Sequence, residues 1–284
     1  MSRPVRNLRP VDQSFRARLS RSATWKARRA TASRRSLPDF VITGGQRCGT
    51  TSLYESLAGH SHIDPSLKKE IHYFDLHIDR GEDWYRAHFP LVSRSAGRLT
   101  FEATPNYLAS VHAPKLMKAL VPDVKLITLL RDPVERTYSS WKLRTYEGAE
   151  NRPFATAVRD ELAGVEVTHD DIDDERRRSL DRAMRWAYVE KSRYDEHFDR
   201  WFEFFDREQF LILKSEALFA DPSAGLAQIE AFLGIDHDPS ITLPHTNFTP
   251  TSSMDASFRQ YLREYFAPHN ERLTSIAGVD FGWA

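Results

Sequence analysis

The stretch "VITGGQRCGTTSLYESLAGH", residues 41–60, decides the fold of this chain of 284 residues. It starts at the end of an apolar segment and passes through a turn that contains Gly44 and Gly49. It then shows a helical pattern in which Leu53 and Leu57 lie on one face. A strand, a glycine-rich turn and a helix in this order direct backbone N–H groups and a helix N-terminus toward an anion. The stretch therefore predicts a P-loop-like phosphate cradle.

The rest of the chain supplies a sheet for this loop. Short apolar or alternating runs predict strands at residues 39–44, 98–104, 124–130 and 209–216. Apolar side chains spaced three and four apart predict helices at residues 50–59, 182–205 and 223–234. Strands that alternate with helices indicate an α/β fold, a P-loop-like three-layer sandwich with a mostly parallel central sheet and helices on both faces.

Charge is balanced over the whole chain but not along it. Lys and Arg number 40, and so do Asp and Glu, so the net charge indicates no class of partner. Residues 1–36 carry many Arg side chains against one acid, Asp12, and few apolar groups to offset the entropy of ordering. We expect a disordered arm there; a membrane or nucleic-acid contact and an organelle transit peptide are the alternatives. Residues 37–284 are expected to form a single domain.

The cysteine content and the hydropathy pattern limit the expected cellular location of the protein. Cys48 is the only cysteine, which excludes an intrachain disulfide and predicts a reducing, cytoplasmic location. No run reaches the roughly 18 apolar residues of a membrane span, and no apolar segment marks a secretion signal. We expect no transmembrane segment and no nucleic-acid partner.

The phosphate loop departs from the pattern of nucleotide triphosphatases. That pattern is G-x-x-x-x-G-K-[ST], and Thr50 stands where the lysine belongs. The nearest cation is Arg47, and Arg131 follows the later strand where a magnesium-binding acid is needed. A phosphosulfate carries less charge than a triphosphate, so a guanidinium and the hydroxyls of Thr50, Thr51 and Ser52 can hold it without a metal. A P-loop kinase or other nucleotide-binding protein is the alternative.

Three motifs together resemble the sulfotransferases that use 3′-phosphoadenosine 5′-phosphosulfate (PAPS), in the carbohydrate branch related to heparan sulfate sulfotransferases. "GGQRCGTTSL" (44–53) resembles their 5′-phosphosulfate loop, "LLRDPVERTYSSW" (129–141) their 3′-phosphate motif, and "KKEIHYFD" (68–75) the segment with their catalytic glutamate. The resemblance extends over residues 40–283. Because no anchor is seen, unlike in the membrane-tethered Golgi enzymes of the family, we expect a soluble bacterial member. It implies transfer of a sulfuryl group from PAPS to a hydroxyl of a glycan, glycolipid or natural product.

The resemblance also implies roles for particular residues. Glu70 falls on the family's base, and Arg47 lies at the leaving end of the reaction. His72 shares a face with Glu70 in an extended segment and is the rival base. Cofactor contacts are implied for Arg47, Cys48, Gly49, Thr50, Thr51, Ser52, Arg131 and Ser139. No metal is expected.

Some features separate this chain from the heparan enzymes. Ala103 replaces a lysine that they carry before Thr-Pro, and "HTNFTPTSS" (245–253) lacks their Lys-Gly-Arg loop. These differences bear on a heparan-like acceptor more than on PAPS binding. For Cys48 a reactive thiol is the alternative to a small packed residue, which we favour. A catalytically inactive binding protein on the same fold is a further alternative, against which the presence of all the site residues argues.

Overall fold

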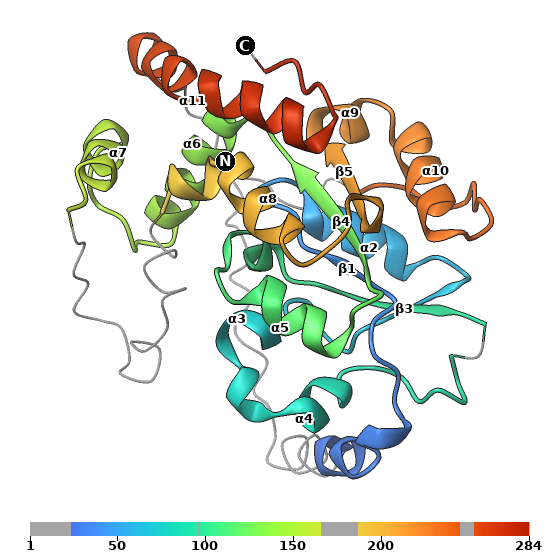
Figure 1. Ribbon diagram of the computed structural model, residues 1–284. Helices are drawn as coiled ribbons and strands as arrows, with labels where there is room; N and C mark the ends of the chain where they lie inside the picture. Colours follow the sequence, from blue (N-terminus) through green and yellow to red (C-terminus); the bar gives the residue numbers. More distant parts are fainter. Residues whose placement is uncertain (1–23, 96, 166–186, 245–252, 284) are drawn as a thin grey trace, which may run out of the picture.

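The computed structural model describes residues 24–95, 97–165, 187–244 and 253–283. At its centre is a five-stranded, all-parallel sheet of order β2-β3-β1-β4-β5 (Figure 1). The strands are β1 (Phe40–Ile42), β2 (Ile63–Pro65), β3 (Leu99–Ala103), β4 (Lys125–Leu130) and β5 (Phe210–Lys214). Sequence analysis predicted four of them and missed β2, a three-residue edge strand with a proline that lacks the apolar signal of a buried strand.

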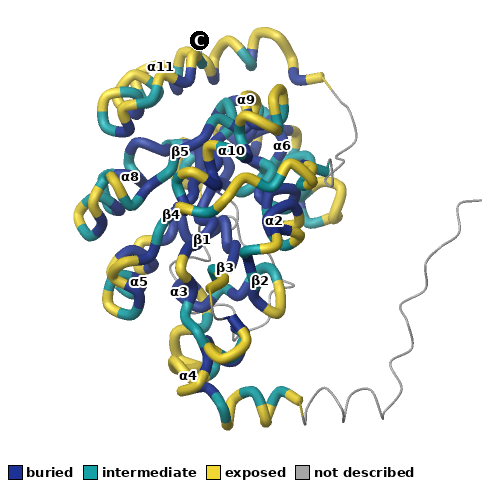
Figure 2. Tube along the Cα trace, turned by 90° about the vertical axis from the view of Figure 1, so that its right-hand side faces the viewer, coloured by how far each residue is buried: buried dark blue, intermediate teal, exposed yellow. Residues whose placement is uncertain are grey.

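Helices cover both faces of the sheet. In β1, Phe40 and Ile42 pack into one hydrophobic cluster and Val41 into another, because successive strand side chains point to opposite faces. The first cluster includes α2 (Thr50–Ala58), α9 (Ser215–Ala220) and α10 (Pro222–Leu233). The second includes α3 (Tyr73–Leu76), α5 (Ala113–Leu120) and α8 (Tyr194–Phe202). The strands between them are the buried centre of the trace in Figure 2, and the predicted three-layer sandwich is confirmed.

Further helices complete the domain beyond the sheet. A third apolar cluster joins α6 (Pro133–Tyr146), α7 (Phe154–Leu162) and α11 (Ala256–Ala277). The short α4 (Glu82–Arg86) lies at the opposite end of the molecule (Figure 1). Single 3₁₀ turns are η1 (Ala32–Arg34), η2 (Ile78–Arg80), η3 (Pro105–Ala109), η6 (Glu190–Ser192) and η7 (Arg207–Gln209). In the described ranges, no helix is both long and apolar enough to cross a membrane.

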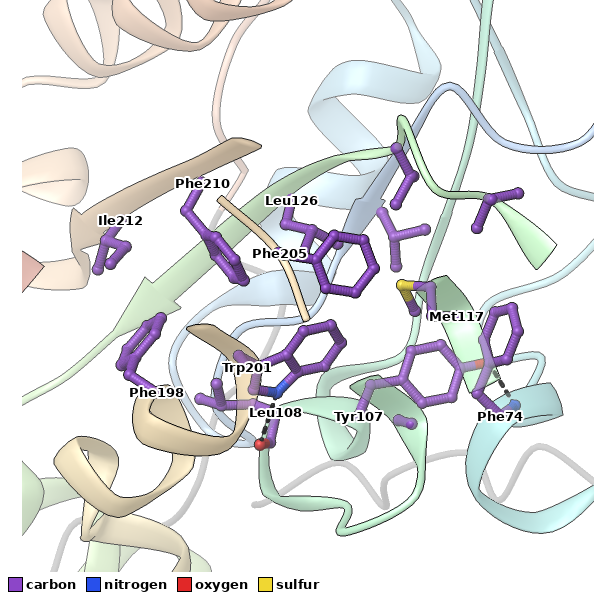
Figure 3. Packing of buried hydrophobic residues seen from close by; sticks show 14 of the residues in the cluster. Phe74, Tyr107, Leu108, Met117, Leu126, Phe198, Trp201, Phe205, Phe210 and Ile212 are labelled. Carbon is purple, nitrogen blue, oxygen red and sulfur yellow. Dashed lines mark hydrogen bonds between the residues drawn. The ribbon is translucent and has the colours of Figure 1, made fainter. Parts of the chain in front are cut away.

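The predicted helix over residues 182–205 is wrong for its described part. Only Tyr194–Phe202 is α-helical, and the 3₁₀ turn η6 precedes it. The carboxylate of Glu161 accepts hydrogen bonds from the N–H groups of Tyr188, Val189 and Glu190, which favours a separate turn. The aromatic side chains are nevertheless core, as expected: Trp201 packs among Phe198, Phe205 and Phe210 and donates to the Leu108 carbonyl at 3.0 Å (Figure 3). Residues 182–186 of the predicted helix lie outside the described residues.

The basic arm does not behave as predicted over its described part. Residues 24–30 are helical and lie beside α4 (Figure 1). Arg28 donates to the carbonyls of Ala87 and Phe89 at 2.6 and 2.7 Å, and the Trp25 ring meets that of Trp84 edge-on. A disordered arm is therefore wrong for residues 24–36, because arginine N–H groups and one tryptophan supply the contacts that aliphatic side chains would otherwise make. Residues 1–23 lie outside the described residues.

Candidate active site

The phosphate loop, residues 43–49, connects β1 to α2 at the carboxyl edge of the sheet. Gly45 N donates to the Leu129 carbonyl at 2.9 Å, so the loop runs against β4. A Cβ at Gly44 would lie 2.3 Å from the Leu129 nitrogen, and one at Gly49 would lie 2.4 Å from the Phe219 ring. Gly49 also has a φ of 90°, which favours glycine. Because α2 starts at Thr50, directly after the loop, its first N–H groups, which have no partner within the helix, lie beside the loop, as the predicted cradle requires.

The second motif meets the first at the same edge. β4 pairs directly with β1, and Arg131 follows its last residue. The side chain of Asp132 caps α6 by accepting from Val134 N at 2.8 Å. Two turns into α6, Ser139 accepts a hydrogen bond from Arg47 Nε at 3.2 Å. The predicted 5′ and 3′ motifs are thus joined by a side-chain contact.

Two adjoining cavities lie at this edge. The first has a volume of about 430 Å³ and is lined by Gln46, Arg47, Gly49, Thr50, Thr51, Ser52, Lys69, Glu70, Pro105, Arg131, Ser139, Ser140, Leu143, Arg144, Ser215, Glu216 and Phe219. The second, of about 520 Å³, is lined by Thr51, Tyr54, Glu55, Lys69, Glu70 and His72. Thr51, Lys69 and Glu70 line both, so the two cavities meet at Glu70.

The structure places almost all the predicted site residues in these cavities; Cys48 is the exception. Its side chain is fully buried and faces Tyr194, and neither cavity includes it. Its N–H donates to the Gly45 carbonyl at 3.2 Å, so it stabilises the loop. Burial raises the pKa of the thiol to about 11, which argues against a reactive thiolate. The side chain of Cys48 is therefore packing and does not contact a ligand in the first cavity.

Glu70 belongs to a continuous hydrogen-bonded chain of side chains. Its Oε2 lies 3.0 Å from His72 Nε2, and His72 Nδ1 lies 2.8 Å from Asp75 Oδ2. Asn106 Nδ2 donates to the same Asp75 oxygen at 2.8 Å. Lys191 Nζ donates to Asn106 Oδ1 at 3.0 Å and also to Gln46 Oε1 at 3.0 Å, which connects the chain to the phosphate loop.

The protonation states of Glu70 and His72 follow from the groups that they contact. Burial alone would raise the pKa of Glu70, but the hydrogen bond from His72 and the charge of Lys69 outweigh it and lower the pKa to about 2. Burial alone would lower the pKa of His72, but its hydrogen bonds to Asp75 and Glu70 raise it to about 9. At neutral pH His72 is therefore an imidazolium that donates to a carboxylate on either side.

A buried carboxylate, through two hydroxyl groups, holds the backbone of the segment that contains Glu70 and His72. Glu102, on β3, is fully buried and accepts from Thr104 Oγ1 at 2.7 Å and from the Tyr107 hydroxyl at 3.1 Å. These hydroxyls in turn accept from backbone N–H groups of the segment, Thr104 from His72 at 3.4 Å and Tyr107 from Tyr73 at 2.8 Å. Burial raises the pKa of Glu102 to about 7, against the hydrogen bonds that these hydroxyls donate. The position of His72 thus depends on residues more than 30 positions away.

Comparison with known proteins places the chain in a family. Residues 37–283 match the sulfotransferase domain family. The chain belongs to the sulfotransferase family. Members use PAPS as the sulfuryl donor, so the predicted family and the predicted PAPS-dependent enzyme are confirmed, and the kinase alternative loses its support.

The sulfotransferase has relatives among human enzymes and solved structures. It is 28% identical over 278 residues to human heparan sulfate glucosamine 3-O-sulfotransferase 6. The aligned region covers 88% of this chain and 75% of that enzyme. It is 32% identical over 226 residues to human bifunctional heparan sulfate N-deacetylase/N-sulfotransferase 3, which covers 78% of this chain and 24% of the relative. The crystal structure of a sulfotransferase from Alicyclobacillus acidocaldarius is similar with a TM-score of 0.67 and 26% identity, over 86% of this chain and 97% of that one.

Sequence reasoning missed several residues of the site. Asp75 ends the quoted motif "KKEIHYFD" three positions after His72, so an i,i+3 pairing was a signal that could have found it. Lys69 stands beside Glu70 in the same motif. Asn106 and Lys191 gave no comparable signal, because their roles depend on contacts with distant segments.

Proposed function

We propose that this sulfotransferase transfers a sulfuryl group from PAPS to a hydroxyl of a glycan acceptor, with Glu70 as the base. The position of Glu70, at the junction of a phosphate-binding cavity and a second cavity, carries the proposal. The first cavity suits the nucleotide and the second suits the acceptor. An acceptor hydroxyl in the second cavity would then meet the sulfuryl group beside the carboxylate.

The first cavity fits PAPS in its donor groups. The loop is packed too tightly against Leu129 and Phe219 for a Cβ at Gly44 or Gly49, which fixes the backbone whose N–H groups would bind a phosphosulfate. Arg47 would bind the 5′-phosphosulfate, and Arg131 and Ser139 would bind the 3′-phosphate. When bound, PAPS supplies the sulfuryl group. We propose that no metal is needed, because the arginines and the helix N-terminus supply positive charge to this anion.

Glu70 is a better candidate for the base than His72. The imidazolium of His72 carries protons on both ring nitrogens, one toward Glu70 and one toward Asp75. It can therefore orient Glu70 but cannot accept another proton. Glu70 keeps oxygen lone pairs and lines both cavities, so it can take the proton of the attacking hydroxyl. Arg47 would stabilise the charge that grows on the leaving oxygen.

The acceptor is proposed to be a glycan, because the relatives named above act on heparan sulfate. The Tyr54 ring and the Glu55 carboxylate line the second cavity, an apolar face and a hydrogen-bond acceptor that suit a sugar with free hydroxyls. We place the reaction in the cytoplasm on the ground of the single cysteine.

The experiment combines binding and transfer. Calorimetry should show that adenosine 3′,5′-bisphosphate binds in the presence of EDTA, and ATP with magnesium should bind more weakly. Radiolabelled PAPS is then offered with heparosan oligosaccharides and with neutral glycolipids, and labelled product is separated from free sulfate. Labelled glycan that disappears in Glu70→Gln supports the proposal. Preference for ATP, or full activity in Glu70→Gln, contradicts it.

A further inference from the structure

Lys69 lies where the two cavities meet. Its side chain is only 13% exposed, and its Nζ lies 3.0 Å from Glu70 Oε1. The same ammonium donates to Thr51 Oγ1 at 3.2 Å. Since Thr51 is in the first turn of α2, Lys69 holds a positive charge between the phosphate cradle and the proposed base.

Sulfuryl transfer requires a positive charge near the place where Lys69 lies. Sulfuryl transfer places negative charge on the attacking oxygen, on the sulfonyl oxygens and on the leaving oxygen. In the function proposed above, Glu70 acts at the first place and Arg47 at the last. An ammonium has three N–H donors, and the contacts with Glu70 and Thr51 use two of them. The third can donate toward the sulfonyl oxygens.

We propose that Lys69 is a further catalytic residue, whose ammonium binds the sulfonyl oxygens during transfer and lies between Arg47 and Glu70. The inference rests on the proposed function. In this step the bond between sulfur and the phosphate oxygen breaks, and a bond between sulfur and the acceptor oxygen forms. The acceptor proton goes to Glu70, and adenosine 3′,5′-bisphosphate leaves. Lys69 keeps its proton and supplies only charge and hydrogen bonds.

The contact with Glu70 gives Lys69 a second effect. Two cations face Glu70, Lys69 at Oε1 and His72 at Oε2. A carboxylate held by two cations is a weak base. When the Lys69 ammonium turns toward the sulfonyl oxygens, the positive charge beside Glu70 falls and its affinity for a proton rises. Bound PAPS would thus raise the proton affinity of Glu70 at the step in which the acceptor hydroxyl loses its proton.

The test compares the affinity for PAPS with that for adenosine 3′,5′-bisphosphate, which lacks the sulfuryl group. Both are measured by calorimetry without acceptor on the full-length wild type, Lys69→Met, Lys69→Arg and the control Lys68→Met, which changes the exposed lysine next to Lys69. Lys69→Met should bind PAPS about 10-fold more weakly and the bisphosphate as the wild type does. With radiolabelled PAPS and an accepted glycan, its kcat should fall about 10²–10³-fold. Lys69→Arg should recover part of both losses, and thermal melting checks that each variant is folded.

The outcomes separate this inference from the proposed function. If the wild type fails to bind adenosine 3′,5′-bisphosphate or to transfer label, the proposed function fails. If the wild type does both and Lys69→Met keeps the wild-type ratio of the two affinities, Lys69 does not contact the sulfonyl oxygens and the inference is overturned. The same holds if Lys69→Met changes only the pH dependence of kcat, because that result assigns Lys69 to Glu70 alone.

Discussion

The phosphate loop at residues 43–49 is held against the adjacent strand β4, whereas residues 68–75 are held by side chains of residues 104–107 at η3. The loop contacts are backbone hydrogen bonds and close approaches at Gly44 and Gly49. The base segment depends on hydroxyls bound to a buried carboxylate and on the amide of Asn106. A cradle for a constant anion can be made from rigid backbone, but a proton-transfer group needs tunable side-chain surroundings.

The largest expected effect separates the two regions directly. Glu70→Gln should lower kcat about 10²–10⁴-fold, because the amide cannot take the acceptor proton. The Kd for adenosine 3′,5′-bisphosphate should stay almost unchanged, because the base segment does not hold the phosphates. Steady-state assays with an accepted glycan and calorimetry measure the two quantities. Glu82→Gln, a carboxylate on α4 that pairs with Arg86, is the control. If Glu70→Gln weakens the binding of adenosine 3′,5′-bisphosphate and leaves kcat unchanged, the proposed division of roles between the two regions is wrong.

The reverse pattern is expected for the phosphate side. Arg131→Ala and Ser139→Ala each remove a charge-assisted hydrogen bond to the 3′-phosphate, a loss of about 1.5–3 kcal/mol or about 10- to 100-fold in Kd. The loss should appear with adenosine 3′,5′-bisphosphate and not with adenosine 5′-phosphate. Arg98→Ala, at a surface pair with Asp64, is the matched control. Equal losses of affinity for both nucleotides would show that Arg131 and Ser139 do not bind the 3′-phosphate.

The pH dependence of stability tests the ionic chain of the base segment. The pKa of His72 is raised to about 9 in the fold, so its contribution to stability is fully present below its ordinary value of about 6.5. That contribution is lost as the pH rises through about 9. The melting temperature of His72→Gln should therefore lie below that of wild type at pH 6 and approach it at pH 10. A difference that stays constant with pH would show that His72 acts by packing and not by charge.

The smallest effect on the site is expected from a third region. Arg28→Ala removes two hydrogen bonds to the carbonyls that follow α4 and should lower the free energy of unfolding by about 1–3 kcal/mol. Cofactor affinity and kcat should stay at wild-type values, because Arg28 lines neither cavity and binds carbonyl groups that follow α4. Denaturant titration gives the first quantity. Arg29→Ala, one position along on the exposed side, is the control, and a loss of activity in Arg28→Ala alone would connect this end of the molecule to the site.

The sequence by itself determined the α/β class, four of the five strands and the family. These signals are local: apolar runs mark buried parallel strands, and Gly44 and Gly49 stand where a side chain would collide. The pairing of Arg47 with Ser139 was also within reach, since both loops end at the carboxyl edge of adjacent strands. Local patterns suffice wherever one segment and its neighbouring strand determine the geometry.

Only the tertiary structure supplied the contacts that favour Glu70 over His72 as the proposed base in residues 68–75. Sequence left Glu70 and His72 as rivals, because a protonation state depends on which charged groups contact the side chain, and a list of neighbouring residues does not give those contacts. Asp75 and Glu70 on either side of the imidazole keep His72 protonated. Folding also turned part of a basic arm into ordered structure, because carbonyls at residues 87 and 89 offered acceptors to Arg28. The partners of Arg28 are 59 and 61 positions away in sequence, whereas those of His72 are near it in the chain and are brought onto its two ring nitrogens by the backbone conformation of the fold.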